Sequence, residues 1–239
     1  MSTVNSNKKS YNETEIVNYY TDFNAAGLFH YEEILIEKYF KTEGRTLDIG
    51  CGAGRVTIPL YERGYQITGM DYAEKMIAAA KAVNGAIDYR VGNILSAPFE
   101  DQEFDNVIFS FNGLMLLESY EERLSAVKEV CRLLKDDGKF IFTTPYLDNK
   151  VKKSYWSETL GIDTGNMSWE QQLELGDEQL EDYGSEFYLH VPFISEVEQM
   201  LEEAGMELLF SARRLDYSGI EKMEDELDDN YLWVTTCKK

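Results

Sequence analysis

Between residues 45 and 145 the sequence alternates short apolar runs with amphipathic runs, and this alternation constrains the fold more than any other feature. The apolar runs have the length of buried strands, and the amphipathic runs have the spacing of helices that end at glycine. Strands that alternate with helices form a parallel sheet with helices on both faces. The predicted strands are 45–50, 65–71, 87–93, 104–111 and 139–145, and the predicted helices are 55–64, 73–85 and 119–138.

The flanks of this region add helices and a closing pair of strands. Apolar residues recur at helical spacing over 13–40, whereas residues 1–10 are polar. After the alternation, the pattern predicts a helix over 195–205 and strands over 206–217 and 231–239. Only about a dozen polar residues separate these two strands, so they favour an antiparallel pair that needs no crossover helix.

The stretch from residue 146 to residue 191 interrupts the alternation. It combines many acidic residues with aromatic ones, such as Tyr155, Trp156 and Phe187. A disordered linker is poor in aromatic residues, so we predict a cap that is folded over the carboxyl edge of the sheet. With 239 residues, the chain has the size of one α/β domain with an insertion. The predicted organisation is a single domain over 1–239 with an inserted cap at 146–191.

Charge and cysteine usage restrict the partners. The formal net charge of -21 repels phosphate backbones and anionic membrane surfaces, so neither nucleic acid nor a membrane is an expected partner. No apolar run reaches the roughly 18 residues of a membrane span, and the N-terminus carries no apolar signal core. Cys51, Cys131 and Cys237 are far apart in the sequence. They predict neither a disulfide nor a zinc site, which fits the reducing cytoplasm.

The segment 45–55, "RTLDIGCGAGR", places three glycines directly after a predicted buried strand. Glycines let the backbone turn sharply and let a ligand approach its N–H groups, although a tight turn without a ligand would use the same residues. Asp71 ends the next predicted strand, where an acid can meet a ribose diol. The spacing is G-x-G-x-G and follows Asp48. A carboxylate at this point suits a ligand with an ammonium and a sulfonium group better than a pyrophosphate.

Four segments occur in an order that resembles the successive motifs of class I S-adenosylmethionine-dependent methyltransferases: "LDIGCGAGR", "GMDYAEKMI", "YRVGNILSAPFEDQEFDNVIFSF" and "RLLKDDGKFIFTTP". They are most similar to the small-molecule group that includes ubiquinone-biosynthesis methyltransferases. The resemblance covers residues 42–147. It implies an α/β, Rossmann-like doubly wound sheet of about seven strands with the last strand antiparallel. It also implies an N-terminal helical lid over 1–41.

The resemblance further implies which residues would bind S-adenosylmethionine. Asp71 would take the two ribose hydroxyls, and Asp48 would order the glycine loop and hold the ammonium group through water. Arg55 would either reach the carboxylate or be an exposed residue of the first helical turn. Tyr20 would either reach the methionyl end from the lid or belong to an ordinary aromatic helix face. The other implied contacts are Gly50, Cys51, Gly52 and Gly54 with the methionine part, Tyr72, Met76, Asn93 and Ile94 with adenine, and Ser110 and Phe111 with the methionyl chain.

Three residues are candidates for catalysis or for contact with the methyl acceptor. Asn112 follows the fourth predicted strand and either faces the transferred methyl group or forms an Asn-Gly turn. Tyr146 follows the fifth strand and either orients a substrate or is only a loop residue. His190 leads back from the insertion and is either a general base or a satisfied structural histidine. We predict no metal site, because residues 135–137 fit the turn before the fifth strand.

Methyl transfer from a sulfonium depends mainly on positioning, and a general base is needed only for a nucleophile that arrives protonated. The sequence therefore predicts a cytoplasmic enzyme that transfers a methyl group from S-adenosylmethionine to a small organic molecule. Two other classes stay open, which are a non-catalytic module that binds S-adenosylmethionine and an NAD(P)-dependent oxidoreductase. The sequence indicates neither the acceptor atom nor the oligomeric state.

Overall fold

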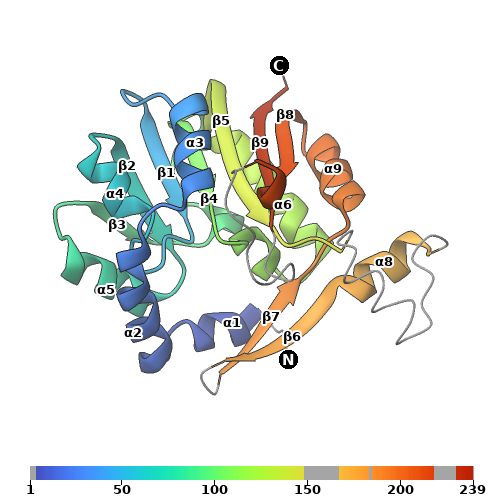
Figure 1. Ribbon diagram of the computed structural model, residues 1–239, viewed down its shortest axis with the longest axis horizontal. Helices are drawn as coiled ribbons and strands as arrows, with labels where there is room; N and C mark the ends of the chain where they lie inside the picture. Colours follow the sequence, from blue (N-terminus) through green and yellow to red (C-terminus); the bar gives the residue numbers. More distant parts are fainter. Residues whose placement is uncertain (1–3, 148–166, 183–184, 218–229, 239) are drawn as a thin grey trace.

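The computed structural model describes residues 4–147, 167–182, 185–217 and 230–238. At its centre is a seven-stranded sheet with the strand order β3-β2-β1-β4-β5-β9-β8 (Figure 1). The strands of this sheet are β1 (Arg45–Ile49), β2 (Gln66–Asp71), β3 (Asp88–Val91), β4 (Phe104–Phe109), β5 (Leu134–Thr144), β8 (Met206–Arg213) and β9 (Tyr231–Cys237).

The pairing of the strands creates a crevice at one edge of the sheet. Strands β3, β2, β1, β4 and β5 are parallel neighbours, and β9 lies antiparallel between β5 and β8. The chain runs outward from β1 to β3 and then returns to β4, so the strand order reverses between β1 and β4. Ligands bind at such a reversal, outside the carboxyl ends of the strands. The predicted Rossmann-like sheet with an antiparallel last strand is confirmed.

Helices cover both faces of the sheet because side chains alternate along the buried strands. Val107 of β4 packs in the core beneath α6 and α9, and its neighbour Ile108 packs in the core beneath α3, α4 and α5. No helix in the described part of the chain is both long and apolar enough to cross a membrane. The helices of the two faces are α3 (His30–Tyr39), α4 (Thr57–Glu62), α5 (Glu74–Val83), α6 (Tyr120–Leu133) and α9 (Ile194–Glu203).

The N-terminal region is divided into several short helices. The predicted helical stretch 13–40 contains α2 (Thr14–Phe23), a 3-10 turn η1 (Asn24–Ala26) and then α3. The break follows η1 at Gly27, whose φ of 60° is available to glycine without strain. Before α2, the polar N-terminus also forms a helix, α1 (Val4–Ser10). Helix α1 packs against β7, described next, and α2 packs against α5.

A small hairpin occupies the later part of the predicted cap. Helix α8 (Trp169–Gly176) leads into β6 (Asp177–Asp182), which pairs antiparallel with β7 (Ser185–His190). Figure 1 shows the hairpin outside the main sheet and next to α1. Tyr155 and Trp156, which suggested the cap, lie outside the described residues. The cap as a functional unit therefore stays a prediction.

The boundary between α6 and β5 differs from the prediction. The predicted helix 119–138 ends at Leu133, and residues 135–137 belong to an irregular start of β5 rather than to a separate turn. The register of β5 on β4 shifts here, and Asp137 has a φ of 62°. Lys135 donates to Asp105 at 2.7 Å, which holds the irregular segment against the start of β4. Residues 135–137 therefore lie in β5, held by the Lys135–Asp105 ion pair, where the helical spacing had predicted the last turn of a helix.

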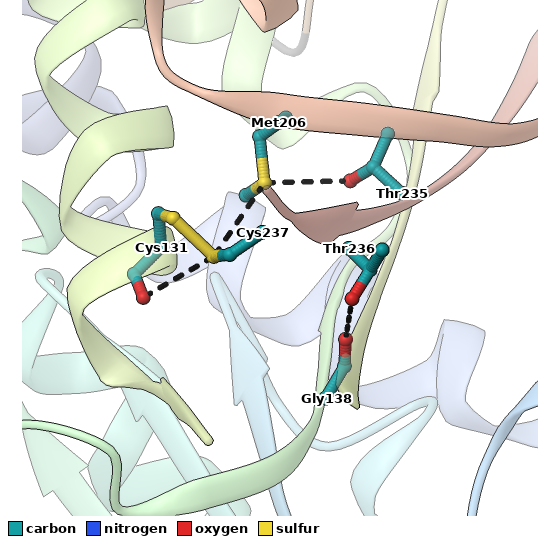
Figure 2. The surroundings of a disulfide bond; sticks show 6 residues. All are labelled: Cys131, Gly138, Met206, Thr235, Thr236 and Cys237. Carbon is teal, nitrogen blue, oxygen red and sulfur yellow. Dashed lines mark hydrogen bonds between the residues drawn. A yellow bond between two sulfur atoms is a disulfide. The ribbon is translucent and has the colours of Figure 1, made fainter. Parts of the chain in front are cut away.

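The prediction that the chain has no disulfide is wrong. Cys131 of α6 and Cys237 of β9 form a disulfide, with their Cα atoms 5.7 Å apart (Figure 2). The two cysteines are 106 residues apart in the sequence, and only the packing of α6 beside the C-terminal strand brings them together. Cys51 is a buried free thiol. Cysteine spacing therefore no longer supports the inference of a reducing compartment.

Candidate functional site

A pocket opens at the carboxyl ends of β1, β2, β3 and β4, under the N-terminal helices. Every residue that the resemblance assigned to the cofactor lines this pocket except Gly54. The predicted residues in its wall are Tyr20, Asp48, Gly50, Cys51, Gly52, Arg55, Asp71, Tyr72, Met76, Asn93, Ile94, Ser110 and Phe111. Their binding roles stay predictions, but the fold gathers them on one surface.

The glycine loop presents an open backbone face to the pocket. Gly52 has a φ of 53°, and a Cβ atom at this position would meet no atom within 4 Å. The space beside Gly52 is therefore available to a ligand. Gly54 serves a different purpose, because its Cβ would lie 2.7 Å from the hydroxyl oxygen of Tyr89. Gly54 thus permits close packing of the loop on β3, and its predicted contact with the cofactor is not supported.

Asp71 ties the end of β2 to the glycine loop. Its carboxylate accepts hydrogen bonds from the Gly52 N–H at 2.9 Å and the Ala73 N–H at 2.8 Å. Burial raises the pKa of Asp71 to about 6, although these backbone hydrogen bonds act in the opposite direction. The carboxylate lies in the pocket wall, where a ligand hydroxyl could use its remaining lone pairs.

Asp48 is the second carboxylate at the base of the pocket. The Thr57 hydroxyl, at the start of α4, donates to it at 2.5 Å. Burial raises the pKa of Asp48 to about 7, even though this hydrogen bond and the charge of Arg55 lower it. Asp48 therefore links the end of β1 to the start of α4, and its predicted role toward the cofactor stays a prediction. A positively charged ligand in the pocket would stabilise its ionised form.

Arg55 is buried, so the interpretation as an exposed first-turn residue is wrong. Its guanidinium donates two hydrogen bonds to the Glu32 carboxylate of α3, at 2.7 and 2.8 Å. The guanidinium also lies 4.3 Å from the centre of the Phe29 ring and donates to the Ser110 hydroxyl at 3.2 Å. Arg55 thus links α3, the glycine loop and the end of β4, with its charge balanced by Glu32.

Aromatic rings from the N-terminal helices and β2 form another wall. Tyr11 lies 5.7 Å from Tyr20 and 6.4 Å from Tyr72, measured between ring centroids. Tyr11 was missed because it follows a polar segment without helical apolar spacing, and Asn7 was missed for the same reason. Further lining residues that were not selected include Asn24, Leu117, Glu118 and Glu122.

Two of the three catalytic candidates lie in the described structure away from the pocket wall. The Asn112 N–H donates to the Thr143 hydroxyl at 3.0 Å, and its side-chain amide donates to Asn230 at 3.1 Å. Its φ of 61° agrees with the interpretation as a turn residue. Tyr146 is buried against the Tyr231 ring, with centroids 5.7 Å apart. The geometry does not place either side chain at the pocket.

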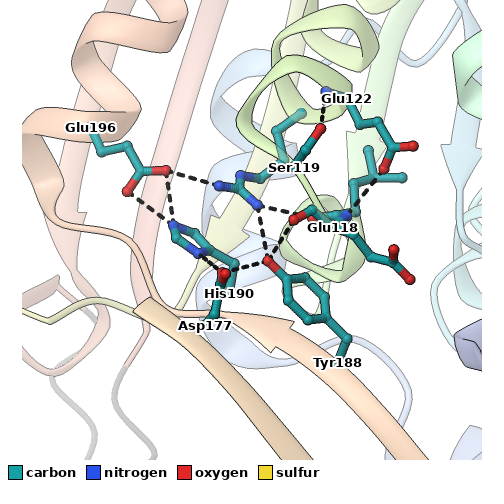
Figure 3. Close-up of polar contacts among 9 residues, drawn as sticks. Glu118, Ser119, Glu122, Asp177, Tyr188, His190 and Glu196 are labelled. Atoms are coloured by element: carbon teal, nitrogen blue, oxygen red, sulfur yellow. Dashed lines mark hydrogen bonds and ion pairs between the residues drawn. The ribbon is translucent and has the colours of Figure 1, made fainter. Parts of the chain in front are cut away.

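His190, the predicted general base, is fully buried in a polar network outside the pocket (Figure 3). Its Nδ1 lies 2.8 Å from Asp177, and its Nε2 lies 2.9 Å from Glu196. Both ring nitrogens are therefore occupied by carboxylates, and neither is available to a ligand. The structural alternative that the sequence left open describes His190 correctly. Among the described residues, no group of acidic, His or Cys side chains is arranged to hold a metal ion.

Comparisons with known proteins connect this fold with methyltransferases. A methyltransferase domain model matches residues 47–142. An uncharacterized methyltransferase of Staphylococcus carnosus is 34% identical over 52% of this chain and 58% of its own length. The ubiquinone biosynthesis O-methyltransferase of Nitrosospira multiformis is 26% identical over 82% of this chain and 78% of its own length.

Solved structures show the same architecture. A methyltransferase structure from Methanosarcina mazei, described as SAM-dependent, superposes with a TM-score of 0.68 at 19% identity, covering 89% of this chain and all of that one. The PH0226 protein of Pyrococcus horikoshii superposes with a TM-score of 0.63 at 25% identity, over 86% of this chain and 87% of that one. The resemblance found in the sequence is confirmed: the chain carries a methyltransferase domain on the class I methyltransferase fold.

Proposed function

We propose that this protein binds S-adenosylmethionine in the pocket at the β1–β4 edge and transfers its methyl group to a small organic acceptor. The observation that carries the proposal is the contact between Asp71 and Gly52. This contact sets a carboxylate at the tip of β2 beside a backbone face that has open space in front of it. A strand-tip acid beside a glycine loop is the arrangement that binds an adenosyl ribose in this type of sheet.

The residues present fit this cofactor. The carboxylate of Asp48 suits a ligand that carries an ammonium and a sulfonium group, whereas it would repel a pyrophosphate, and the carboxylate of Asp71 can accept hydrogen bonds from ribose hydroxyls. Asn24 adds a buried side-chain oxygen that has no hydrogen-bond partner among the described residues. We assign the ribose to Asp71 and the ammonium end to Asp48. The adenine is assigned to the group formed by Tyr72, Met76, Asn93 and Ile94.

When bound, the cofactor supplies a methyl group on a positively charged sulfur. The protein then has to hold the acceptor in line with that methyl group and exclude water. Helices α1 and α2, which contribute Asn7 and Tyr20 to the pocket, are placed to exclude water as the proposed lid over 1–41. The proposed cap at 146–191 would complete the acceptor side. We assign no general base, because Asn112, Tyr146 and His190 do not line the pocket.

Two observations support a small organic acceptor. Relatives at 26% to 36% identity are named as ubiquinone or demethylmenaquinone methyltransferases, which are names of small-molecule reactions. The net charge of -21 opposes binding of nucleic acids. A non-catalytic S-adenosylmethionine-binding module is the second candidate, and the absence of the three predicted catalytic residues from the pocket wall favours it. The G-x-G-x-G spacing of the loop and the acid at Asp48 argue against an NAD(P)-dependent enzyme.

Calorimetric titration with S-adenosylmethionine, S-adenosylhomocysteine and NADH tests the proposal. We expect binding of both adenosyl ligands in the micromolar range, about -8 kcal/mol, and no binding of NADH. Formation of S-adenosylhomocysteine in the presence of a panel of small acceptors would then separate an enzyme from a binding module. If neither adenosyl ligand binds, the proposed function is wrong.

A further inference from the structure

The contacts of the two His190 ring nitrogens bear on which of them carry a hydrogen. A carboxylate oxygen can only accept a hydrogen bond, so a ring nitrogen that faces an ionised carboxylate must carry a hydrogen. His190 faces a carboxylate on both sides, with Asp177 at 2.8 Å from Nδ1 and Glu196 at 2.9 Å from Nε2. With both carboxylates ionised, the geometry requires hydrogens on both ring nitrogens, and the ring then carries a positive charge.

The surrounding charges balance such a cation. Arg123 of α6 is buried, and its guanidinium lies 3.3 Å from Glu196. Two positive groups, His190 and Arg123, then face two negative ones, the buried Glu196 of α9 and the half-exposed Asp177 of β6. Tyr188 of β7 also contacts the network, and its hydroxyl lies 2.5 Å from Asp177. Buried charges persist only when they are paired in this way.

The network reaches the pocket through Tyr188 and Arg123. The Tyr188 hydroxyl lies 2.8 Å from the Glu118 carbonyl oxygen, and the Arg123 guanidinium donates to the Leu117 carbonyl at 2.9 Å. Leu117 and Glu118 line the pocket. Figure 3 shows Tyr188 between Glu118 on one side and the pair of Asp177 and His190 on the other. One wall of the pocket is thus fastened to the charge network.

The backbone of Tyr188 also holds helix α1 in place, through the side chain of Asn7. The Asn7 side chain accepts from the Tyr188 N–H at 2.8 Å and donates to its carbonyl at 3.0 Å. It donates as well to the Leu116 carbonyl at 3.1 Å. Asn7 is buried and lines the pocket. Helix α1, the hairpin and the segment before α6 therefore meet at Tyr188, although they are far apart in the sequence.

We propose that His190 is a positively charged positioning residue that holds the β6–β7 hairpin against α9 and α6. With the hairpin held there, Tyr188 keeps α1 and the Leu117–Glu118 segment in place as one wall of the pocket. His190 touches neither cofactor nor acceptor in this arrangement. It acts through Asp177 and Tyr188. The expected effect of this clamp on ligand affinity rests on the proposed function, whereas the expected protonation of the His190 ring is independent of it.

The first experiment is nitrogen NMR of the full-length protein with ¹⁵N-labelled histidine at neutral pH. The chain has only two histidines, and the variant His30→Gln identifies the signal of the exposed one. We expect the remaining ring to show two protonated nitrogens with slowly exchanging N–H hydrogens. A ring with one unprotonated nitrogen would overturn the proposal.

The second experiment measures S-adenosylhomocysteine affinity of Tyr188→Phe, which removes the hydroxyl that contacts both Asp177 and the Glu118 carbonyl. We expect the dissociation constant to rise by about fivefold, as for the loss of one buried hydrogen bond, with the doubly protonated His190 signal retained. Tyr61→Phe is the matched control, because Tyr61 is an exposed tyrosine of α4 outside the pocket wall. Unchanged affinity in Tyr188→Phe would show that the clamp does not position the wall.

The two experiments separate this proposal from the proposed function. If the unmodified protein does not bind S-adenosylhomocysteine, the proposed function fails while the NMR result still decides the charge of His190. If the unmodified protein binds the ligand but Tyr188→Phe binds it equally well, the clamp proposal fails and the proposed function stands.

Discussion

Two groups of carboxylates in the molecule have opposite environments, one buried at the pocket and one that includes the half-exposed Asp177. Asp48 and Asp71 lie at the pocket, and burial raises their pKa values to about 7 and about 6. Asp177 belongs to the His190 network, where hydrogen bonds from His190 and Tyr188 outweigh the effect of burial and lower its pKa. The difference lies in exposure and in the partners. Asp177 is half exposed and accepts hydrogen bonds within its network, whereas Asp48 and Asp71 are buried and the pocket-lining Arg55 is already paired with Glu32.

This comparison indicates how structural and ligand-binding charges can be told apart. A carboxylate that is paired within the protein stabilises the fold and gains nothing from a ligand. A buried carboxylate without a protein cation is destabilised in its ionised form, so a positively charged ligand restores its favourable state. The pocket therefore fits the cationic cofactor that we propose, and the His190 network fits a structural clamp.

The largest effect is expected from His190→Leu. The substitution removes one cation and leaves Asp177 and Glu196 with Arg123 alone, so the free energy of unfolding should fall by about 3 to 5 kcal/mol. Urea denaturation measures this change. His30→Leu, at an exposed position, should change stability by about 0.5 kcal/mol or less. Equal stabilities of the two variants would contradict the structural assignment of the network.

The next effect concerns the pocket. Gly52→Val would place a branched side chain in the open space beside the loop, and affinity for S-adenosylmethionine should fall tenfold or more, about 1.4 kcal/mol. Gly205→Val is the matched control, since Gly205 also has a positive φ and open space around its Cβ but lies outside the pocket wall. Both variants should lose similar stability, while only the first should lose binding in calorimetry.

The smallest effect is a pH dependence that arises at Asp48. A carboxyl group whose pKa is raised in the folded state binds more protons folded than unfolded between its ordinary value and about 7, so its contribution to stability falls as pH rises through this range. Asp48→Asn should therefore stabilise the ligand-free protein at about pH 8 by on the order of 1 kcal/mol, and this gain should vanish near pH 4.

Ligand binding should show the opposite trend in the same titration. Because a cation favours ionised Asp48, S-adenosylmethionine affinity of the unmodified protein should weaken as pH falls below about 7. Thermal denaturation with and without ligand at several pH values measures both trends. If the affinity does not change with pH, the pocket carboxylates do not interact with the charge of the ligand, and they would not differ from Asp177 in the way proposed above.

Much of the fold could be predicted because it depends on local patterns. The apolar strands, the glycine stops and the spacing around Asp48 and Asp71 are all read over a few residues, and the structure places them at one sheet edge. The polar N-terminus shows the limit of this reasoning. Asn7 is buried because its amide forms hydrogen bonds with the Tyr188 backbone, and the residue pattern of its own segment does not predict this contact.

The doubly wound sheet and the glycine loop between β1 and α4 could be predicted from local patterns, because strand length, helical periodicity and turn chemistry act between near neighbours. The partners of the isolated polar groups depend on packing in three dimensions. His190 is buried between Asp177 and Glu196, Arg55 is buried against Glu32, and Cys131 is joined to Cys237. Each of these outcomes depends on a partner from a different element, and that partner is chosen by packing rather than by sequence spacing.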